Sequence, residues 1–179
     1  MTEAQAANLL GALALALTDR VTEAVAAATG QGQSAAAALS ALRHFEADPS
    51  VDLLARILGL TSSGTVRLVD RLVAAGLVRR DRPGHDARVA TLHLSAAGRR
   101  AADKVTAARA EVLAAAMAGL EEADRAALGD LAGRVMGAMT RGPGAVRWGC
   151  RMCDTGACRR YQGGCPVALA ATARLSGRA

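Results

Sequence analysis

The strongest indications of the fold lie in residues 61–94, TSSGTVRLVDRLVAAGLVRRDRPGHDARVATLHL. The first half of this stretch predicts an amphipathic helix that Thr61 or Ser62 can cap and that Gly76 ends. Its second half changes to the two-residue period of strands, and the Pro-Gly-His-Asp sequence at 83–86 is typical of a turn between two strands. A helix followed directly by a β-hairpin is therefore expected. The buried stripe of that helix is expected to consist of Leu68, Val69, Leu72 and Val73.

A second short helix is predicted just before this stretch. The segment VDLLARILGL, residues 51–60, follows a possible cap at Ser50 and has its large apolar residues on one face. It ends at Gly59. Two short helices joined by a tight turn form a helix-turn-helix, and the hairpin that follows would be its wing. The fold class predicted is mainly α with a small β-hairpin wing.

The flanking segments also read as helices. A helix over 3–28 ends at glycines 30 and 32, and a second runs from Ser34 to about Phe45. Ser95 can cap an alanine-rich helix to about Ala118, and another helix ends near Met139. The sequence then predicts a linker at 141–144 and a short helix at 166–175. The expected organisation is an N-terminal dimerisation helix at 1–33, a winged helix-turn-helix at 34–95, C-terminal dimerisation helices at 96–140 and a cysteine-rich extension at 141–179.

Charge points to an anionic partner. The formal net charge is +6 and the isoelectric point about 10.1. Residues 61–101 contain eight arginines and three aspartates, a concentration suited to a phosphate backbone. The apolar run at 9–17 is too short to span a bilayer and has no basic leader, so a cytoplasmic protein without a membrane partner is expected. No nucleophile–base or carboxylate pair suggests an enzyme.

The predicted recognition helix has a polar face suited to the major groove of DNA. Arginine binds guanine edges, and serine hydroxyls near a helix N-terminus bind phosphates. On the wing, Arg88 is the candidate for a minor-groove contact, and Asp86 could orient its guanidinium. The helix residues that share this face are Ser62, Ser63, Arg67, Asp70 and Arg71.

The stretch from Gly59 to Arg100 resembles the core of MarR-type transcriptional regulators, through the RLVDRL helix, the GLVRR entry to the wing, the Asp-x-Arg pair and the LSAAG helix start. The resemblance implies a homodimer formed by the N- and C-terminal helices, bound to near-palindromic double-stranded DNA. Ser62, Ser63, Arg67 and Arg71 would then lie in the groove, and Arg88 would make the wing contact. Ala87 departs from the family, which often has a second arginine there. Many members bind small anionic ligands, and His44 is a possible lining residue.

All four cysteines of the chain follow a C-x2-C-x4-C-x6-C spacing in a glycine- and arginine-rich segment: Cys150, Cys153, Cys158 and Cys165. Iron–sulfur clusters accept irregular spacings and often have proline after the last cysteine, so a [2Fe–2S] or [4Fe–4S] cluster is favoured. Structural zinc usually needs two C-x2-C knuckles, and metal-free redox thiols are a third possibility. The CRMCD and CPV elements resemble the C-terminal extension of one MarR branch, which supports metal binding without naming the metal.

Three functions remain open. The first is a DNA-binding regulator that responds to redox state or iron through the cysteines, whose position after the last dimer helix suggests that cluster loss would shift the dimer helices. The second is a small-ligand-responsive repressor with structural zinc. The third is an electron-transfer or metal-binding protein on a helix-turn-helix scaffold.

Overall fold

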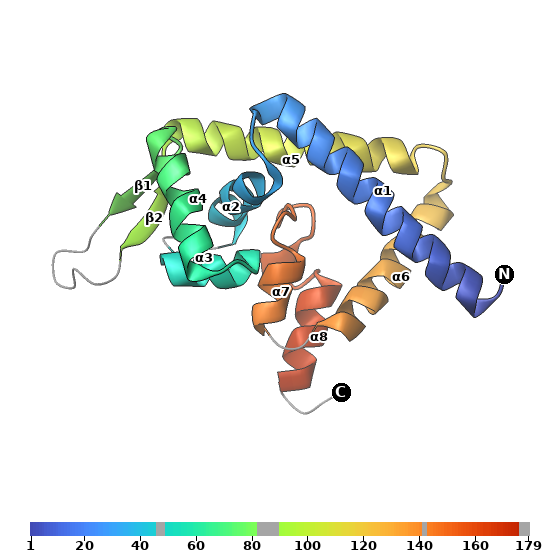
Figure 1. Cartoon of the computed structure of the whole chain (residues 1–179). Coiled ribbons are helices and arrows are strands. Elements are labelled where there is room, and N and C mark those ends of the chain that lie inside the picture. Colours follow the sequence, from blue (N-terminus) through green and yellow to red (C-terminus); the bar gives the residue numbers. More distant parts are fainter. Residues whose placement is uncertain (46–48, 82–89, 141–142, 176–179) are drawn as a thin grey trace.

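The computed structural model describes residues 1–45, 49–81, 90–140 and 143–175. It is mainly helical with one antiparallel hairpin, which confirms the predicted fold class (Figure 1). No helix among these residues is long and apolar enough to cross a membrane. The elements in chain order are α1 (Glu3–Thr29), α2 (Gln33–His44), α3 (Val51–Leu58), α4 (Ser62–Ala74), β1 (Val78–Asp81), β2 (Thr91–Leu94), α5 (Ala96–Met117), α6 (Glu122–Met139), α7 (Pro143–Gly149), a 3-10 turn (Arg160–Gln162) and α8 (Pro166–Leu175).

Hydroxyl side chains cap four of the described helices: three at positions that the sequence predicts, and Thr2 at the start of α1. Ser50, Thr61 and Ser95 each accept a backbone N–H bond from the third residue onward. The start of α2 was predicted wrongly, because its cap is Gly32 and the helix begins one residue before Ser34. Helix α2 therefore has no side-chain cap.

The core of the winged helix-turn-helix lies where α2, α3, α4 and the hairpin meet. The predicted stripe on α4 is correct at Leu68, Val69 and Leu72 and wrong at Val73, which is 38% exposed. Thr65 is fully buried in its place and donates its hydroxyl to the Thr61 carbonyl at 3.0 Å. Because that bond satisfies the hydroxyl within the helix, the threonine methyl can pack like an apolar side chain.

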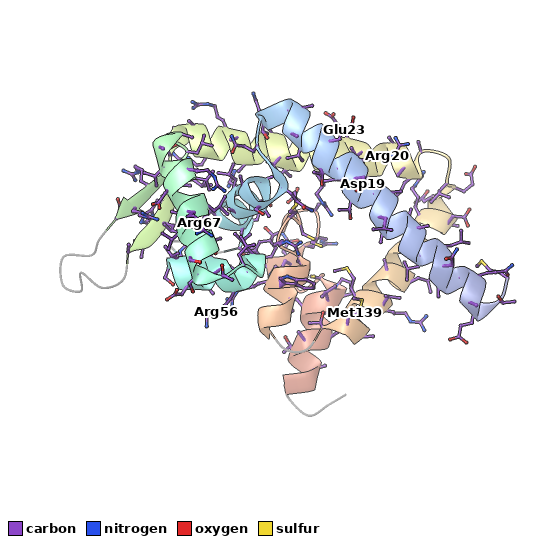
Figure 2. All side chains as sticks on the ribbon, viewed as in Figure 1. Asp19, Arg20, Glu23, Arg56, Arg67 and Met139 are labelled. Carbon is purple, nitrogen blue, oxygen red and sulfur yellow. The ribbon has the colours of Figure 1, made fainter. Side chains whose placement is uncertain are left out.

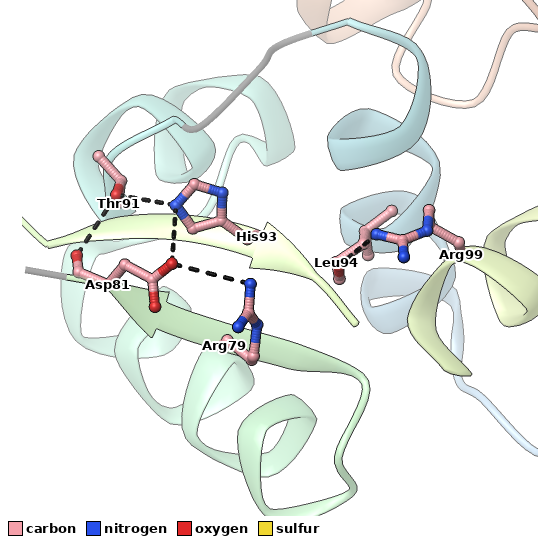
Figure 3. Close-up of polar contacts among 6 residues, drawn as sticks. All are labelled: Arg79, Asp81, Thr91, His93, Leu94 and Arg99. Atoms are coloured by element: carbon pink, nitrogen blue, oxygen red, sulfur yellow. Dashed lines mark hydrogen bonds and ion pairs between the residues drawn. The ribbon is translucent and has the colours of Figure 1, made fainter. Parts of the chain in front are cut away.

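A small polar cluster joins the two strands of the hairpin, near the end of β1 and the start of β2 (Figure 3). The Asp81 carboxylate lies 3.4 Å from His93 Nε2 and 3.8 Å from the Arg79 guanidinium. The Thr91 hydroxyl lies 3.1 Å from His93 Nε2 and 3.3 Å from the Asp81 carbonyl. Beyond these strands lie residues 82–89, outside the described residues, so the predictions for Asp86 and Arg88 stay untested.

The C-terminal segment packs as part of the fold. Residues 143–149, which include half of the predicted linker, form α7, with proline at a first helical position that tolerates it. Helix α8 packs on α6 at two glycines, where a Cβ on Gly133 would lie 2.9 Å from Pro166 Cγ and one on Gly137 3.1 Å from Ala170 Cβ. In Figure 1 the chain between α7 and α8 lies between α2 and the long helix pair α1 and α5.

Candidate functional site

Helix α4 presents the predicted polar face to solvent. Ser62 and Ser63 open the helix beside its Thr61 cap, and their side chains are exposed. Arg67 is also exposed, one turn further along α4. Figure 2 labels Arg67 on α4 and Arg56 on the neighbouring helix α3. This face of α4 offers hydroxyl and guanidinium groups to solvent. Such groups can bind phosphates and base edges.

Two residues of that face have a different setting. The Asp70 carboxylate accepts a hydrogen bond of 2.6 Å from the Arg80 guanidinium on β1, and this ion pair connects α4 to the hairpin. Arg71 is exposed and borders a depression at the turn between α1 and α2, lined by residues 30–35. Arg67 and the two serines are therefore the more central part of the candidate reading face.

Local hydrogen bonds to the backbone fix the position of each cysteine. Cys150 follows α7, with its N–H bonded to the Val146 carbonyl, and the Cys153 N–H bonds back to Cys150 at 2.8 Å. The Asp154 carboxylate accepts N–H bonds from the next loop residues, which closes the turn that precedes Cys158. Cys165 directly precedes α8 and accepts its first backbone bond, from Leu169. We call residues 150–165 the thiol loop.

The four thiols lie together at one end of a small apolar core that includes Val146 and Val167. Side-chain hydrogen bonds join Cys150 to Cys153, Cys153 to Cys158 and Cys158 to Cys165. The bond from Cys150 lowers the pKa of Cys153, helped by two nearby arginines, and the same bond together with burial raises the pKa of Cys150. Burial raises the pKa of Cys158 to about 11.

The surroundings of these thiols suit an anionic group. Arg109 of α5 and Arg160 of the loop both favour a negative charge on Cys153. The Nη1 atom of Arg160 is buried and has no hydrogen-bond partner among the described residues. Four thiolates on a metal would supply both the charge and an acceptor for it. The four sulfurs are arranged here as hydrogen-bonded thiols, and within the described ranges no set of three or more histidine, cysteine or acidic side chains already has the geometry of a metal site.

The thiol loop and α7 also contact the helix-turn-helix. The Tyr161 hydroxyl donates to the His44 carbonyl at 2.9 Å, and the Thr155 hydroxyl to the same atom at 3.4 Å. The Trp148 indole lies against Gly59, in the turn between α3 and α4.

These contacts were missed at the sequence level, although a signal for them was present. The chain has only one phenylalanine, one tryptophan and one tyrosine. All three lie at this junction: Phe45 under the Arg160 guanidinium, Trp148 against the turn, and Tyr161 at the end of α2. Such a concentration of a scarce residue type could have indicated an internal interface.

A cavity of about 300 Å³ lies between α1, α5 and the thiol loop. Its polar lining comes from Thr18, Thr22 and Gln33 and from the two arginines Arg109 and Arg151, and Cys153 borders it. The sequence pointed to His44 for a ligand site, and His44 is not among the lining residues.

Comparison with known proteins agrees with this geometry. Residues 29–89 match the profile of the MarR family. These residues are thus similar to the winged-helix domain of that family. A MarR family protein from Bacillus stearothermophilus is similar at 27% identity, with a TM-score of 0.70 over 79% of this chain and 99% of that one.

Two further MarR-like structures have the same fold. Apo MarR from E. coli has 19% identity and a TM-score of 0.59 over 70% of this chain and 96% of its own. A MepR mutant from S. aureus, bound to an oligodeoxyribonucleotide, has 14% identity and a TM-score of 0.56 over 75% and 97%. No curated protein matches the sequence.

Proposed function

We propose that the chain is a transcriptional regulator that binds near-palindromic double-stranded DNA as a homodimer, with α4 in the major groove. The observation that carries this proposal is the exposed face of α4, where Ser62, Ser63 and Arg67 follow a capped helix N-terminus beside an arginine-rich hairpin. The MepR structure with bound oligodeoxyribonucleotide supports it as a relative of the same fold.

The long helices support a second copy as the dimer partner. Their exposed side chains include large apolar residues, which a monomer in water would rarely expose in such number. Those on α1 and α6 include Leu9, Leu10, Leu13, Leu15, Leu128, Leu131, Val135 and Met139.

DNA binding is tested by fluorescence anisotropy with labelled duplex from the promoter region of the protein's own gene. We expect binding that weakens steeply as salt rises, because released counterions drive association. Wild-type protein that binds no duplex more tightly than a scrambled one at any salt concentration contradicts the proposal.

We further propose that Cys150, Cys153, Cys158 and Cys165 hold an iron–sulfur cluster and that this site makes DNA binding respond to redox state or iron. The four hydrogen-bonded thiols, the two nearby arginines and the orphaned Nη1 of Arg160 support an anionic centre. When bound, the cluster supplies a redox-sensitive anion. The residues of the loop would hold it, shield it with the apolar side chains of α7 and α8, and balance its charge.

The test is an absorption spectrum of protein purified without oxygen, with iron, sulfide and zinc assayed on the same sample. A cluster gives thiolate-to-iron absorption between about 320 and 460 nm, whereas zinc gives a colourless protein. Cys153→Ser should remove the colour and any redox-dependent change in DNA affinity. A colourless protein with stoichiometric zinc would make the site structural.

The cavity beside Cys153 favours a second candidate, a regulator that responds to a small anionic ligand. Its volume of about 300 Å³ lies at the lower end of the range for ligand sites. Arg109 and Gln33 line it and could orient a carboxylate. Release of DNA by benzoate-like acids in wild-type protein but not in Arg109→Gln would support this alternative over cluster sensing.

A further inference from the structure

The thiol loop contacts both halves of the winged-helix architecture. On one side Met152 packs against the core shared by α1, α2 and α5, which includes Val25 and Val105. The same Met152 side chain also packs against the core of the helix-turn-helix. The thiol loop therefore lies between the long helices and the DNA-reading helices and contacts both.

The thiol loop contacts the end of α2, and the preceding helix α7 contacts the turn between α3 and α4. The Thr155 and Tyr161 hydroxyls both bond to the carbonyl of His44, the last residue of α2. The Trp148 indole lies against Gly59, whose left-handed backbone, with φ of 66°, makes the turn between α3 and α4. A displacement of the thiol loop together with α7 would therefore act on the end of α2 and on the turn that joins α3 to α4.

Arg160 joins these contacts to the thiols. Its guanidinium carbon lies 5.2 Å from the centre of the Phe45 ring, directly after α2, which is a cation–π distance. Its Nη1 atom is buried without a hydrogen-bond partner among the described residues. One side chain thus touches the end of α2 and still has a donor free for a charge on the sulfurs.

We propose that the thiol loop positions the DNA-reading helices, and that Arg160, Trp148 and Tyr161 are the positioning residues through which metal loading of the four cysteines raises DNA affinity. The inference rests on the proposed function, because it takes both DNA binding and metal binding by the cysteines as given. It locates the coupling at the C-terminal end of α2 and the α3–α4 turn, rather than in the dimer helices alone.

Metal loading is expected to raise DNA affinity because it restricts the conformations of the thiol loop. Four ligand bonds hold the loop in one conformation, whereas free thiols leave it room to move. A fixed loop restricts α3 and α4 to fewer orientations, so a larger fraction of the protein is ready for DNA. Typical coupling between two sites is five- to 150-fold, and we expect a loss of DNA affinity of about tenfold when the metal is removed.

The experiment compares loaded and stripped samples of the full chain without oxygen. Loaded protein is reconstituted with ferrous iron and sulfide, or with Zn²⁺ if the purified protein holds zinc. In wild type, loading should tighten DNA binding about tenfold. In Arg160→Gln we expect the same metal content, and loaded and stripped samples should bind DNA with nearly equal affinity. The matched control is Arg159→Gln, since Arg159 is exposed and its side chain bonds within the loop to Gln162; it should keep the wild-type ratio.

A second measurement needs no variant. Loading should slow backbone hydrogen exchange in α3 of the wild type, because the thiol loop and α7 then hold the end of α2 and the turn that follows α3. Tyr161→Phe, which removes one hydroxyl, should lose part of this protection and keep the metal.

The inference is overturned if Arg160→Gln retains the full affinity ratio and exchange in α3 is unaffected by loading, while wild type binds both metal and DNA. A chain that binds no metal, or no DNA, overturns the proposed function and this inference with it.

Discussion

Trp148 and Gly59, almost ninety positions apart in the chain, lie in direct contact, so that a Cβ added to Gly59 would be 2.8 Å from the indole Nε1. This contact joins α7 to the turn of the helix-turn-helix. It makes the C-terminal segment a structural neighbour of the DNA-reading unit.

Gly59→Ala should be more destabilising than a substitution that costs only backbone strain. Gly76 is the matched control, because it has nearly the same φ, 68°, and no atom within 4 Å of an added Cβ. We expect Gly76→Ala to cost about 1–2 kcal/mol of unfolding free energy and Gly59→Ala about 1–3 kcal/mol more, measured by urea denaturation. In a Trp148→Ala background the two costs should become equal. A persistent difference there would show that the indole is not the cause.

Gly133→Ala should displace α8 and with it Cys165. An alanine methyl at this position meets the rigid ring of Pro166, whereas at Gly129 of the same helix it meets nothing within 4 Å. We expect Gly129→Ala to raise the free energy of unfolding by up to about 1 kcal/mol through helix propensity. Gly133→Ala should lower it by about 1–3 kcal/mol and reduce metal retention. Equal effects of the two substitutions on thermal unfolding would contradict the close packing of α6 on α8.

The Asp70–Arg80 ion pair should matter more for DNA binding than for stability. Its carboxylate side chain is 54% exposed, so a double-mutant cycle with Asp70→Asn and Arg80→Gln should give a coupling of only about 0.5 kcal/mol. Asp70→Asn removes a negative charge from the reading face and releases Arg80, so affinity for unrelated duplex should rise. Weaker binding of unrelated DNA by this variant would place Asp70 in direct contact with a base.

The free energy of unfolding should decrease as the pH is lowered through the range in which histidine takes up a proton. Burial, aided by Arg43, lowers the pKa of His44 below its usual 6.5, although Asp154 and Asp103 oppose the shift. The unfolded chain therefore binds the proton more readily, and the free energy of unfolding decreases as pH drops below about 6.5.

The measurement is urea denaturation at about pH 7.5 and about pH 5.5 in wild type and His44→Gln. The glutamine variant should lose less stability on acidification. Identical losses in the two proteins would exclude His44 as the source.

Local elements of the fold could be predicted from the sequence, whereas contacts between distant segments could not. Periodicity and hydroxyl caps predicted α3, α4 and the hairpin, because Ser50, Thr61 and Gly59 are local signals that act within a few residues. The contacts of Trp148 and Tyr161 could not be predicted, since they depend on how α7 and the thiol loop fold back across about a hundred residues. Thr65 was missed for a related reason: its burial depends on a hydrogen bond that composition does not reveal.

Recognition of DNA by α4 is tested by selection of sites from a random duplex pool by wild type and Arg67→Ala. Wild type should enrich a near-palindrome with half-sites about one helical turn apart. Arg67→Ala should lose preference at one base pair of each half-site, a cost of about 1–3 kcal/mol, while Arg134→Ala on the remote helix α6 enriches the wild-type motif. No enriched motif for wild type, or an unchanged motif for Arg67→Ala, would exclude α4 as the helix that recognises DNA bases.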